Sequence, residues 1–311
     1  MLTVLKTALE VGLIYGLVAL ALFISFSILN IADLSTDGCF TLGCAVGAML
    51  TIAGHPLLAL PAAMAAGMLS GFITAFLQTR LGVESILAGI ISNTGLYTIN
   101  LAVMGFSSNV SITGRATVFS LFKALTGGSQ WSTLVLLALL LGVIAVVLIR
   151  FFGTSLGLSI RATGDSLDMV SASSINPKAT ITIGLCLANA LTALAGCLIG
   201  EYNKFCDINL GTGMVTIALA SLIIGEVFAG RRGGIGKRVV CVVLGSIVYR
   251  LIIALALRLN ISAEYFKLVS AVIVAVAIAA PNMKDYVHLA KIRSNARKLR
   301  ALSGKEDETD A

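Results

Sequence analysis

The stretch "STLVLLALLLGVIAVVLIRF", residues 132–151, is apolar apart from Ser132 and Thr133 at its start and Arg150 near its end. A helix needs about 20 such residues to cross the hydrocarbon core of a bilayer. The whole chain has the same character, since 58% of its residues are hydrophobic, 12% are charged and the mean hydropathy is +0.99. Soluble domains have about 45–50% apolar and about 25% charged residues. These values predict a polytopic membrane protein.

Apolar runs recur along the chain and set the predicted fold. We expect an all-α, polytopic transmembrane helical bundle of about nine membrane segments, forming one domain over residues 1–281. The second and seventh segments are short and Gly-rich, which is typical of helices packed inside a bundle or broken beside a cavity. The predicted segments are residues 4–27, 39–54, 56–78, 85–105, 132–151, 178–200, 213–229, 239–258 and 264–281.

The basic residues lie mainly at the ends of the apolar runs, although the net charge of +7 alone would also suit a nucleic-acid partner. That placement fits membrane topology and excludes a nucleic-acid-binding stripe. With the N-terminus outside and the C-terminus cytoplasmic, most of the 22 Lys and Arg residues fall on the cytoplasmic side. Residues 152–177 are then the longest cytoplasmic loop, and residues 282–311 form a basic, then acidic, cytoplasmic tail.

Two stretches resemble each other, "NIADLSTDGCFTLGCAVGAML" (30–50) and "KFCDINLGTGMVTIALASLII" (204–224). Each follows a long apolar run and continues from Asp through a Gly-containing turn into a helix of small residues. The predicted topology puts Asp33 towards the inner side and Asp207 towards the outer side. This arrangement indicates an inverted repeat of the kind that builds transport pathways, although two short matches also fit coincidence.

The sequence offers no cofactor or nucleotide site. "GRRGGIGKR" (230–238) lacks the first Gly of a phosphate-binding loop, and Arg238 replaces the hydroxyl that would bind magnesium. The six cysteines lie mostly in apolar runs without metal-ligand spacing, so we expect small buried side chains and no metal site. If the chain moves a solute with ATP, a separate chain must hydrolyse it.

The polar stretch "RATGDSLDMVSASSINP" (161–177) separates two long apolar runs. We expect Gly164 to break the chain and Asp165 to cap a short amphipathic helix that ends before Pro177. A helix this short is marginal in isolation. It is either an ordinary solvated loop helix or a segment stabilised by packing into a groove of a partner.

Several ordered motifs carry a resemblance to a known family. "GTSLGLSIRATGDSLDMVSASSINP" (153–177) resembles the coupling-helix loop of ABC importer permeases of the branched-chain amino-acid and ribose permease superfamily. "ADLSTDGCFTLG" and "GEVFAGRRGGIG" resemble two further motifs of that superfamily. "SNTGLYTINLAVMG" and "CDINLGTGMVTIALASLIIGE" resemble its tryptophan/tyrosine-type uptake branch. The resemblance covers roughly residues 5–280 and departs at Ser171 and Ser174, where a charged residue and Gly are commoner.

The resemblance implies a membrane-spanning permease that acts as a pair, most simply a homodimer, in a bacterial cytoplasmic (inner) membrane. An extracytoplasmic substrate-binding protein would deliver the solute, and two ABC ATPase subunits would grip one coupling helix from each permease. Membrane lipid is the remaining partner. The residues expected to contact the ATPase are Arg161, Gly164, Asp165, Asp168, Met169 and Val170.

Polar residues inside the predicted spans are candidates for the translocation path, because burying them in a membrane is costly. Helix capping and hydrogen bonding between helices are the structural alternatives. Glu226 would either bind an ammonium group or pair with Arg231. The candidates are Asp33, Ser35, Thr36, Asp37, Asn93, Thr94, Asn189 and Glu226.

Glu201, Lys204 and Asp207 fall on the predicted outer side, where they would either contact the binding protein or lie in a solvated loop. By resemblance the solute is an amino acid, with an aromatic one such as tryptophan or tyrosine expected, and sugars and nucleosides are the rivals. A secondary transporter driven by an ion gradient is the alternative from another class. A scaffold or receptor without transport would leave the mid-span polar residues unexplained.

Overall fold

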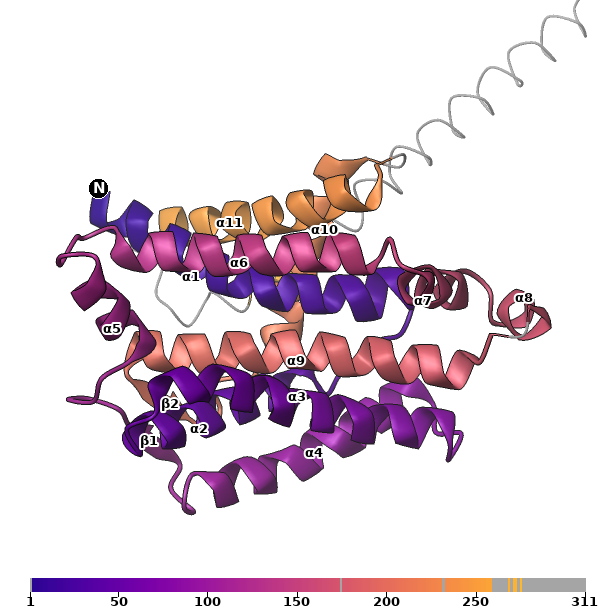
Figure 1. The fold of residues 1–311 in the computed structure, drawn as a ribbon, viewed down its shortest axis with the longest axis horizontal. Helices are drawn as coiled ribbons and strands as arrows, with labels where there is room; N and C mark the ends of the chain where they lie inside the picture. The colour runs from indigo at the N-terminus through magenta and orange to yellow at the C-terminus, as the bar shows by residue number, and fades with distance from the viewer. Residues whose placement is uncertain are drawn as a thin grey trace, which may run out of the picture.

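The structure is a computed structural model that describes residues 2–173, 175–230 and 233–258, together with positions 268, 271, 272 and 275. The predicted last span (264–281, apart from those positions), the tail (282–311), Ser174, Arg231 and Arg232 lie outside the described residues. Within the described part, the chain is a bundle of helices with one short two-stranded ribbon (Figure 1).

Among the described residues, six helices are long and apolar enough to cross a membrane. The first continues beyond Leu22 as a π-helical segment, η1 (Phe23–Ile28), without a break in direction that would end the span. Their positions agree with the predicted long segments that fall within the described residues. The long helices are α1 (Leu2–Leu22), α3 (Pro56–Thr79), α4 (Ser85–Val103), α6 (Ser132–Phe151), α9 (Pro177–Asn203) and α11 (Ile235–Arg258).

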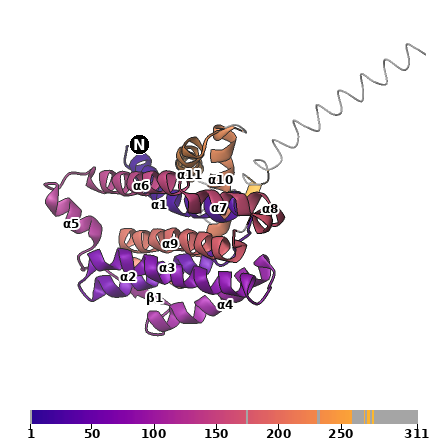
Figure 2. The ribbon, with the colours of Figure 1, turned by 45° about the vertical axis from the view of Figure 1, so that its right-hand side comes forward.

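Two shorter apolar helices, α2 (Thr36–Ile52) and α10 (Met214–Ala229), correspond to the predicted short segments. The remaining elements lie at the two ends of the bundle. Helix α5 (Val118–Leu125) and strands β1 (Asn109–Ser111) and β2 (Phe205–Asp207) are at the end that holds the N-terminus. Helices α7 (Ser155–Asp165) and α8 (Leu167–Ala172) are at the opposite end in both views (Figures 1 and 2).

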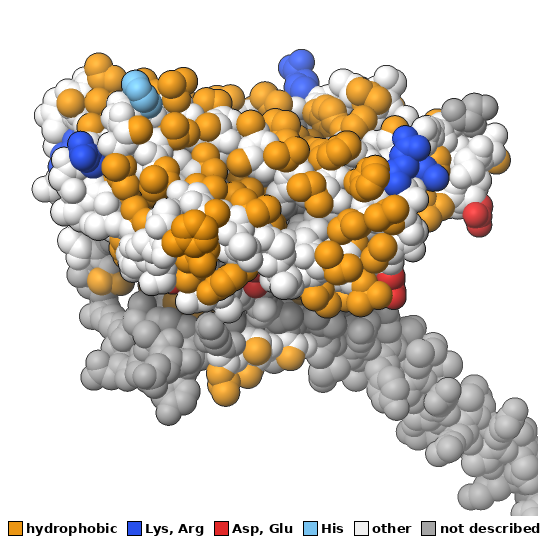
Figure 3. Space-filling view, turned by 90° about the horizontal axis from the view of Figure 1, so that it is seen from below, with side chains coloured by type: hydrophobic (Ala, Val, Ile, Leu, Met, Phe, Trp, Pro, Cys, Tyr) orange, Lys and Arg blue, Asp and Glu red, His pale blue; other side chains and the backbone are white. Residues whose placement is uncertain are grey.

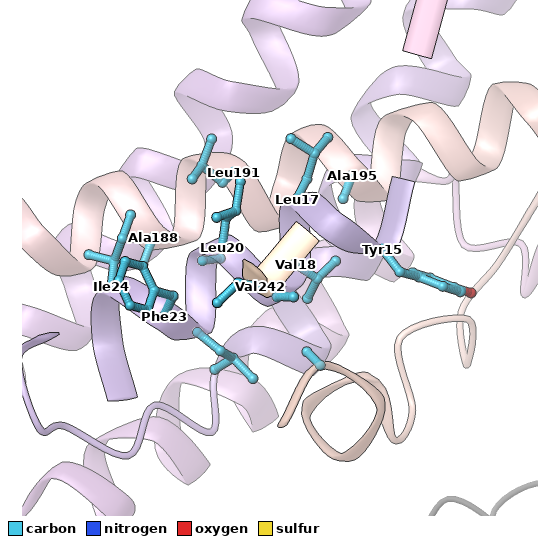
Figure 4. Close-up of a cluster of buried hydrophobic side chains, with 14 of the residues drawn as sticks. Tyr15, Leu17, Val18, Leu20, Phe23, Ile24, Ala188, Leu191, Ala195 and Val242 are labelled. Carbon is cyan, nitrogen blue, oxygen red and sulfur yellow. The ribbon is translucent and has the colours of Figure 1, made fainter. Parts of the chain in front are cut away.

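The core forms where α1 and α9 lie side by side in the middle of the bundle, because these two helices are mainly buried whereas α4 and α6 are mainly exposed. Figure 4 shows Leu17, Leu20 and Phe23 of α1 and η1 with Leu191 of α9 and Val242 of α11 in this core. Exposed apolar side chains on the outer helices are expected of a chain whose surroundings are lipid.

Glycines allow α9 to approach its neighbours at backbone distance. A Cβ on Gly43 of α2 would lie 1.9 Å from the Ala193 carbonyl oxygen, and one on Gly196 of α9 would lie 1.9 Å from that of Phe40. A Cβ on Gly71 of α3 would lie 2.5 Å from the Leu185 carbonyl oxygen. Small residues at helix interfaces are the usual means of close packing in membranes. The α2–α3–α9 layer therefore depends on these glycines.

The two short helices begin at one place and run towards opposite ends of the bundle. At their starts, the Asp37 carboxylate of α2 accepts hydrogen bonds from the Gly213 and Val215 amides of α10. At the end of α2, the Thr51 hydroxyl donates a hydrogen bond to Glu201, which lies near the end of α9. Towards the end of α10, Glu226 accepts a hydrogen bond from the Ser27 hydroxyl of η1. Each short helix follows a long one and a non-helical return. The inverted repeat itself stays a prediction.

Candidate functional site

Asp37 lies where the two short helices start. Its Oδ2 accepts a hydrogen bond from the Gly213 amide and its Oδ1 one from the Val215 amide, each at 2.9 Å. These amides belong to the N-terminal end of α10, where the helix dipole favours a negative charge. Asp37 also stands in the first turn of its own helix, α2. The capping role weighed for this motif therefore involves a helix far away in the sequence.

Asp33 joins the return segment before α2 to the central helix α9. It is 3% exposed, and its Oδ1 accepts hydrogen bonds from the Ser35 amide (2.8 Å) and hydroxyl (2.6 Å). Its Oδ2 accepts one from Asn189 Nδ2 of α9 at 2.8 Å. The Thr36 hydroxyl donates to the Asp33 carbonyl. The structure thus brings together Asp33, Ser35, Thr36 and Asn189, all predicted as path candidates.

Two buried polar atoms near this cluster have no hydrogen-bond partner within the part of the chain that the structure describes: Asn189 Oδ1 and Asn100 Oδ1. Asn100 Nδ2 donates to the Gly38 carbonyl of α2 at 3.0 Å, so α4 is tied to the same region. Buried polar groups normally have partners, and exceptions require an explanation such as a bound water or ligand. The name polar centre is used below for four residues described so far: Asp33, Asp37, Asn100 and Asn189.

The two α4 candidates differ in position. Asn93 is half-buried and faces α2, because its Oδ1 lies 2.6 Å from where a Cβ on Gly38 would be. Thr94 is exposed, and its hydroxyl donates to the Ile90 carbonyl of its own helix. Asn93 therefore borders the polar centre, whereas Thr94 points away from it.

Glu226 is also separate from the polar centre, at the end of α10. Its Oε1 accepts from Arg238 Nη2 of α11 at 2.7 Å and from the Ser27 hydroxyl of η1. Arg238 Nη2 also donates to Ser27 Oγ at 2.6 Å, and its Cζ lies 5.0 Å from the centre of the Phe23 ring. The structure thus shows Glu226 in an ion pair with Arg238, whereas Arg231, the predicted partner, lies outside the described residues. We call Ser27, Glu226 and Arg238 the end triad.

Helix α7 rests directly on η1. A Cβ on Gly164 would lie 1.8 Å from the Ile28 carbonyl oxygen, so only Gly permits this contact. The Thr163 and Thr180 hydroxyls form a hydrogen bond of 2.8 Å between α7 and α9. Single π-helical turns inside longer helices are often found at functional sites. The stretch that contacts α7 is thus also the stretch that carries Ser27.

The hairpin differs in detail from its prediction. Gly164 does not break the chain, since α7 continues to Asp165, and Ser166 is the residue that caps α8 by accepting a hydrogen bond from the Met169 amide. Val170 is 2% exposed and packs inward, so the prediction that it faces a partner is wrong. Leu167 and Met169 are 53% and 68% exposed. Arg161, Asp165 and Asp168 are exposed as well.

The predicted contact role of Glu201 is wrong. Glu201 is 1% exposed, and its carboxylate accepts hydrogen bonds from the Val118 amide of α5 (2.8 Å) and the Thr51 hydroxyl of α2 (3.1 Å). It therefore fixes α5 on the bundle. Lys204 is exposed, in a left-handed conformation at the end of α9. Asp207 is half-buried, pairs with Asn109 in the ribbon, and accepts a hydrogen bond from the Asn209 amide.

Comparisons with known proteins agree over almost the whole chain. Residues 4–278 match the family model described as "Branched-chain amino acid transport system / permease component". A tyrosine transport system permease protein of Clostridioides difficile (strain R20291) is 30% identical over 297 residues, which cover 95% of this chain and 96% of that relative. An uncharacterized protein of Rickettsia prowazekii (strain Madrid E) is 31% identical over 285 residues, covering 91% of this chain and 99% of the relative. No solved structure matches the chain.

Proposed function

Because the chain belongs to the branched-chain amino acid permease family, we propose that it forms the translocation path of an ATP-driven importer through residues 1–281. The chain is a multi-pass membrane permease of an ABC-type transport system, a transport component rather than an enzyme. In the proposal, residues 152–177 transmit the work of a separate ATPase to the bundle.

The observation that carries this proposal is the way the hairpin is built. Leu167 and Met169 project from α8 as exposed apolar side chains, next to the exposed charges of Asp165 and Asp168. Large exposed apolar side chains with a polar border are typical of protein interaction sites. The base of the hairpin is rigidly seated, because Gly164 contacts the η1 backbone and Thr163 bonds to Thr180. Such a hairpin can pass a displacement of its tip into the bundle.

The route from the hairpin to the polar centre is short. From η1 the chain returns through residues 29–35 to α2, and this return carries Asp33, which Asn189 holds against α9. Asp37 then links α2 to the start of α10. A displacement of η1 by α7 would therefore reach both short helices. The end triad ties the same η1 segment to α10 and α11, so we propose that it sets how far the inner end of the path can open.

The polar centre is the proposed narrow part of the path. Short helices whose N-termini meet inside a bundle are a common design of transporter sites. The unpartnered oxygens of Asn100 and Asn189, with the carboxylates of Asp33 and Asp37 nearby, would suit the ammonium group of an amino acid. The likeness to a tyrosine transport permease supports an aromatic amino acid as the solute. Sugars and nucleosides are the rival solutes.

The remaining partners follow from this scheme. We propose an extracytoplasmic binding protein at the end that holds α5, Lys204 and Asp207, and a second copy of this chain beside the first in a bacterial inner membrane. The C-terminus would be cytoplasmic. Described basic residues gather at the end that holds α7 and α8, which supports this orientation: Arg80, Arg150, Arg161, Lys178, Lys237 and Arg238.

The experiment that tests the proposal changes the tip of the hairpin in liposomes that contain the permease, its ATPase and its binding protein. Met169→Asp places a charge on the exposed apolar surface of α8, and should abolish solute-stimulated ATP hydrolysis and uptake while the permease still inserts. Met169→Leu is the matched control, because it changes the same exposed side chain but keeps its size and apolar character, and it should leave ATP hydrolysis and uptake unchanged. Uptake that persists without the ATPase, or is unchanged by Met169→Asp, would instead favour a secondary transporter.

A further inference from the structure

A cavity of about 520 Å³ lies between the last turns of α3 and the first turns of α9. Its walls include Phe72, Phe76 and Arg80 from α3, and Lys178 and Ile183 from α9. It lies at the end of the bundle that holds α7 and α8, since Lys178 is in the first turn of α9, just after the hairpin. None of the site residues discussed above lines it.

The rim of the cavity is positively charged. Arg80 and Lys178 are both exposed, and neither forms an ion pair with a carboxylate among the described residues. No Asp or Glu is among the lining residues, and the other polar groups at the rim are neutral: Thr79, Asn176 and Thr182. Two cations that line one cavity, with no carboxylate among its described lining residues, would suit an anionic ligand.

The inner wall of the cavity is apolar and continues along the outside of the bundle. Phe72, Phe76 and Ile183 are 50%, 45% and 37% exposed, and the two Phe rings lie 6.4 Å apart. Leu69, one turn further along α3, is 63% exposed. Figure 3 shows the bundle from below the view of Figure 1, with hydrophobic side chains spread across that face. The cavity thus runs from a cationic rim into an apolar groove.

We propose that this cavity binds an anionic phospholipid, with the phosphate between Arg80 and Lys178 and an acyl chain along Phe72 and Phe76. Basic pockets between transmembrane helices at the cytoplasmic side are suited to anionic lipid headgroups. A free phosphate would bind Arg80 and Lys178 but would leave the aromatic wall uncovered. An acidic peptide such as "KEDETD" from the chain's own tail would do the same. A lipid bound here would join α3 to α9 where α9 leaves the hairpin, and so would stiffen the seat of α8.

The test measures lipid retention by the full-length chain in detergent, using native mass spectrometry with equal amounts of phosphatidylglycerol and phosphatidylethanolamine of the same acyl chains. The unchanged protein should retain phosphatidylglycerol selectively. Arg80→Gln with Lys178→Gln should reduce that preference about tenfold or more, because each cation near an anionic headgroup contributes substantially to binding. Arg115→Gln with Lys123→Gln removes the same charge at the opposite end and should leave the preference unchanged.

Further arms identify the source of the anion. Inorganic phosphate or a "KEDETD" peptide should not displace phosphatidylglycerol, and displacement by either would overturn the proposal. A preference that survives in the double variant, or is lost equally in the control, would overturn it as well. Should the double variant fail to fold, Lys178→Gln alone should still weaken the preference about fivefold. Because no ATPase or solute is present, the result is independent of whether the proposed transport function is correct.

Discussion

Asp37 shows how one side chain can join two halves of a membrane bundle. Its two carboxylate oxygens accept hydrogen bonds from two amides at the start of α10, those of Gly213 and Val215. These amides lie at the start of the helix, where N–H groups have no partner within the helix, so without Asp37 two partly buried N–H groups would lose the hydrogen bonds described above. The charge of Asp37 is in turn stabilised by those amides.

Replacing Asp37 by Asn should therefore destabilise the fold. An amide side chain can accept from one of the two N–H groups, but its own NH₂ would face the other. The lost hydrogen bond should lower the free energy of unfolding by about 1–3 kcal/mol, and the purified protein should show a lower thermal midpoint. Asp207→Asn is the control, since Asp207 accepts only the Asn209 amide among the hydrogen bonds given above, in an accessible turn. Equal midpoints for the two variants would contradict the role assigned to Asp37.

At the residue scale, the sequence was a good guide to which polar residues are buried in the bundle, but a poor guide to their hydrogen-bond partners. Asp33 and Asn189 stood out because intramembrane polar groups are costly, but nothing in the sequence indicated that they bond to each other. Glu201 resembled a loop residue because it lies near the end of a helix. Its burial results from α5, which folds back onto it and is amphipathic enough to pack there. Asn100 and Arg238 were missed for the same reason, since their roles depend on tertiary contacts.

At the scale of elements, η1 is the segment on which the others converge. It follows α1, carries Ser27 of the end triad, and supports Gly164 of α7. Hydropathy predicted the span to residue 27 but could not indicate a π-helical turn, because that turn changes the hydrogen-bond pattern and not the apolar character. Helices α2 and α10 were predicted as short because their apolar runs are short, and their common starting point emerged only from the fold.

Gly164→Ala should separate the hairpin from the bundle while leaving its tip intact. The added Cβ would clash with the Ile28 carbonyl, which belongs to a buried backbone and cannot give way easily. Overpacking of this kind typically costs about 1–3 kcal/mol. In liposomes with the ATPase, we expect ATP hydrolysis to continue while uptake per ATP falls severalfold.

The control for this change is Gly142→Ala in α6. No heavy atom lies within 4 Å of the Cβ that this change would add, so it should be neutral or stabilise the helix by up to about 1 kcal/mol. If Gly164→Ala couples uptake to ATP as well as Gly142→Ala does, then α7 does not act through η1.

At the scale of the whole molecule, the two ends of the bundle have different characters. One end has the short ribbon and also α5, which Glu201 holds against the bundle, and the other has a projecting hairpin and a cluster of basic residues. The bundle between them contains two short helices that start together and diverge. The proposed function would use this asymmetry, because a solute would be received at one end and mechanical work at the other.

The orientation of these ends can be measured directly with single cysteines. Leu125 of α5 and Met169 of α8 are exposed, while five of the six native cysteines are buried and Cys186 is partly so. In intact cells, a membrane-impermeant maleimide should label Leu125→Cys but not Met169→Cys, and permeabilised cells should show labelling of both. The unchanged chain gives the background. The positive-inside bias of the described residues is the physical reason for this expectation. Labelling of Met169→Cys from outside would place the hairpin beyond the reach of a cytoplasmic ATPase, and the proposed coupling would then be untenable.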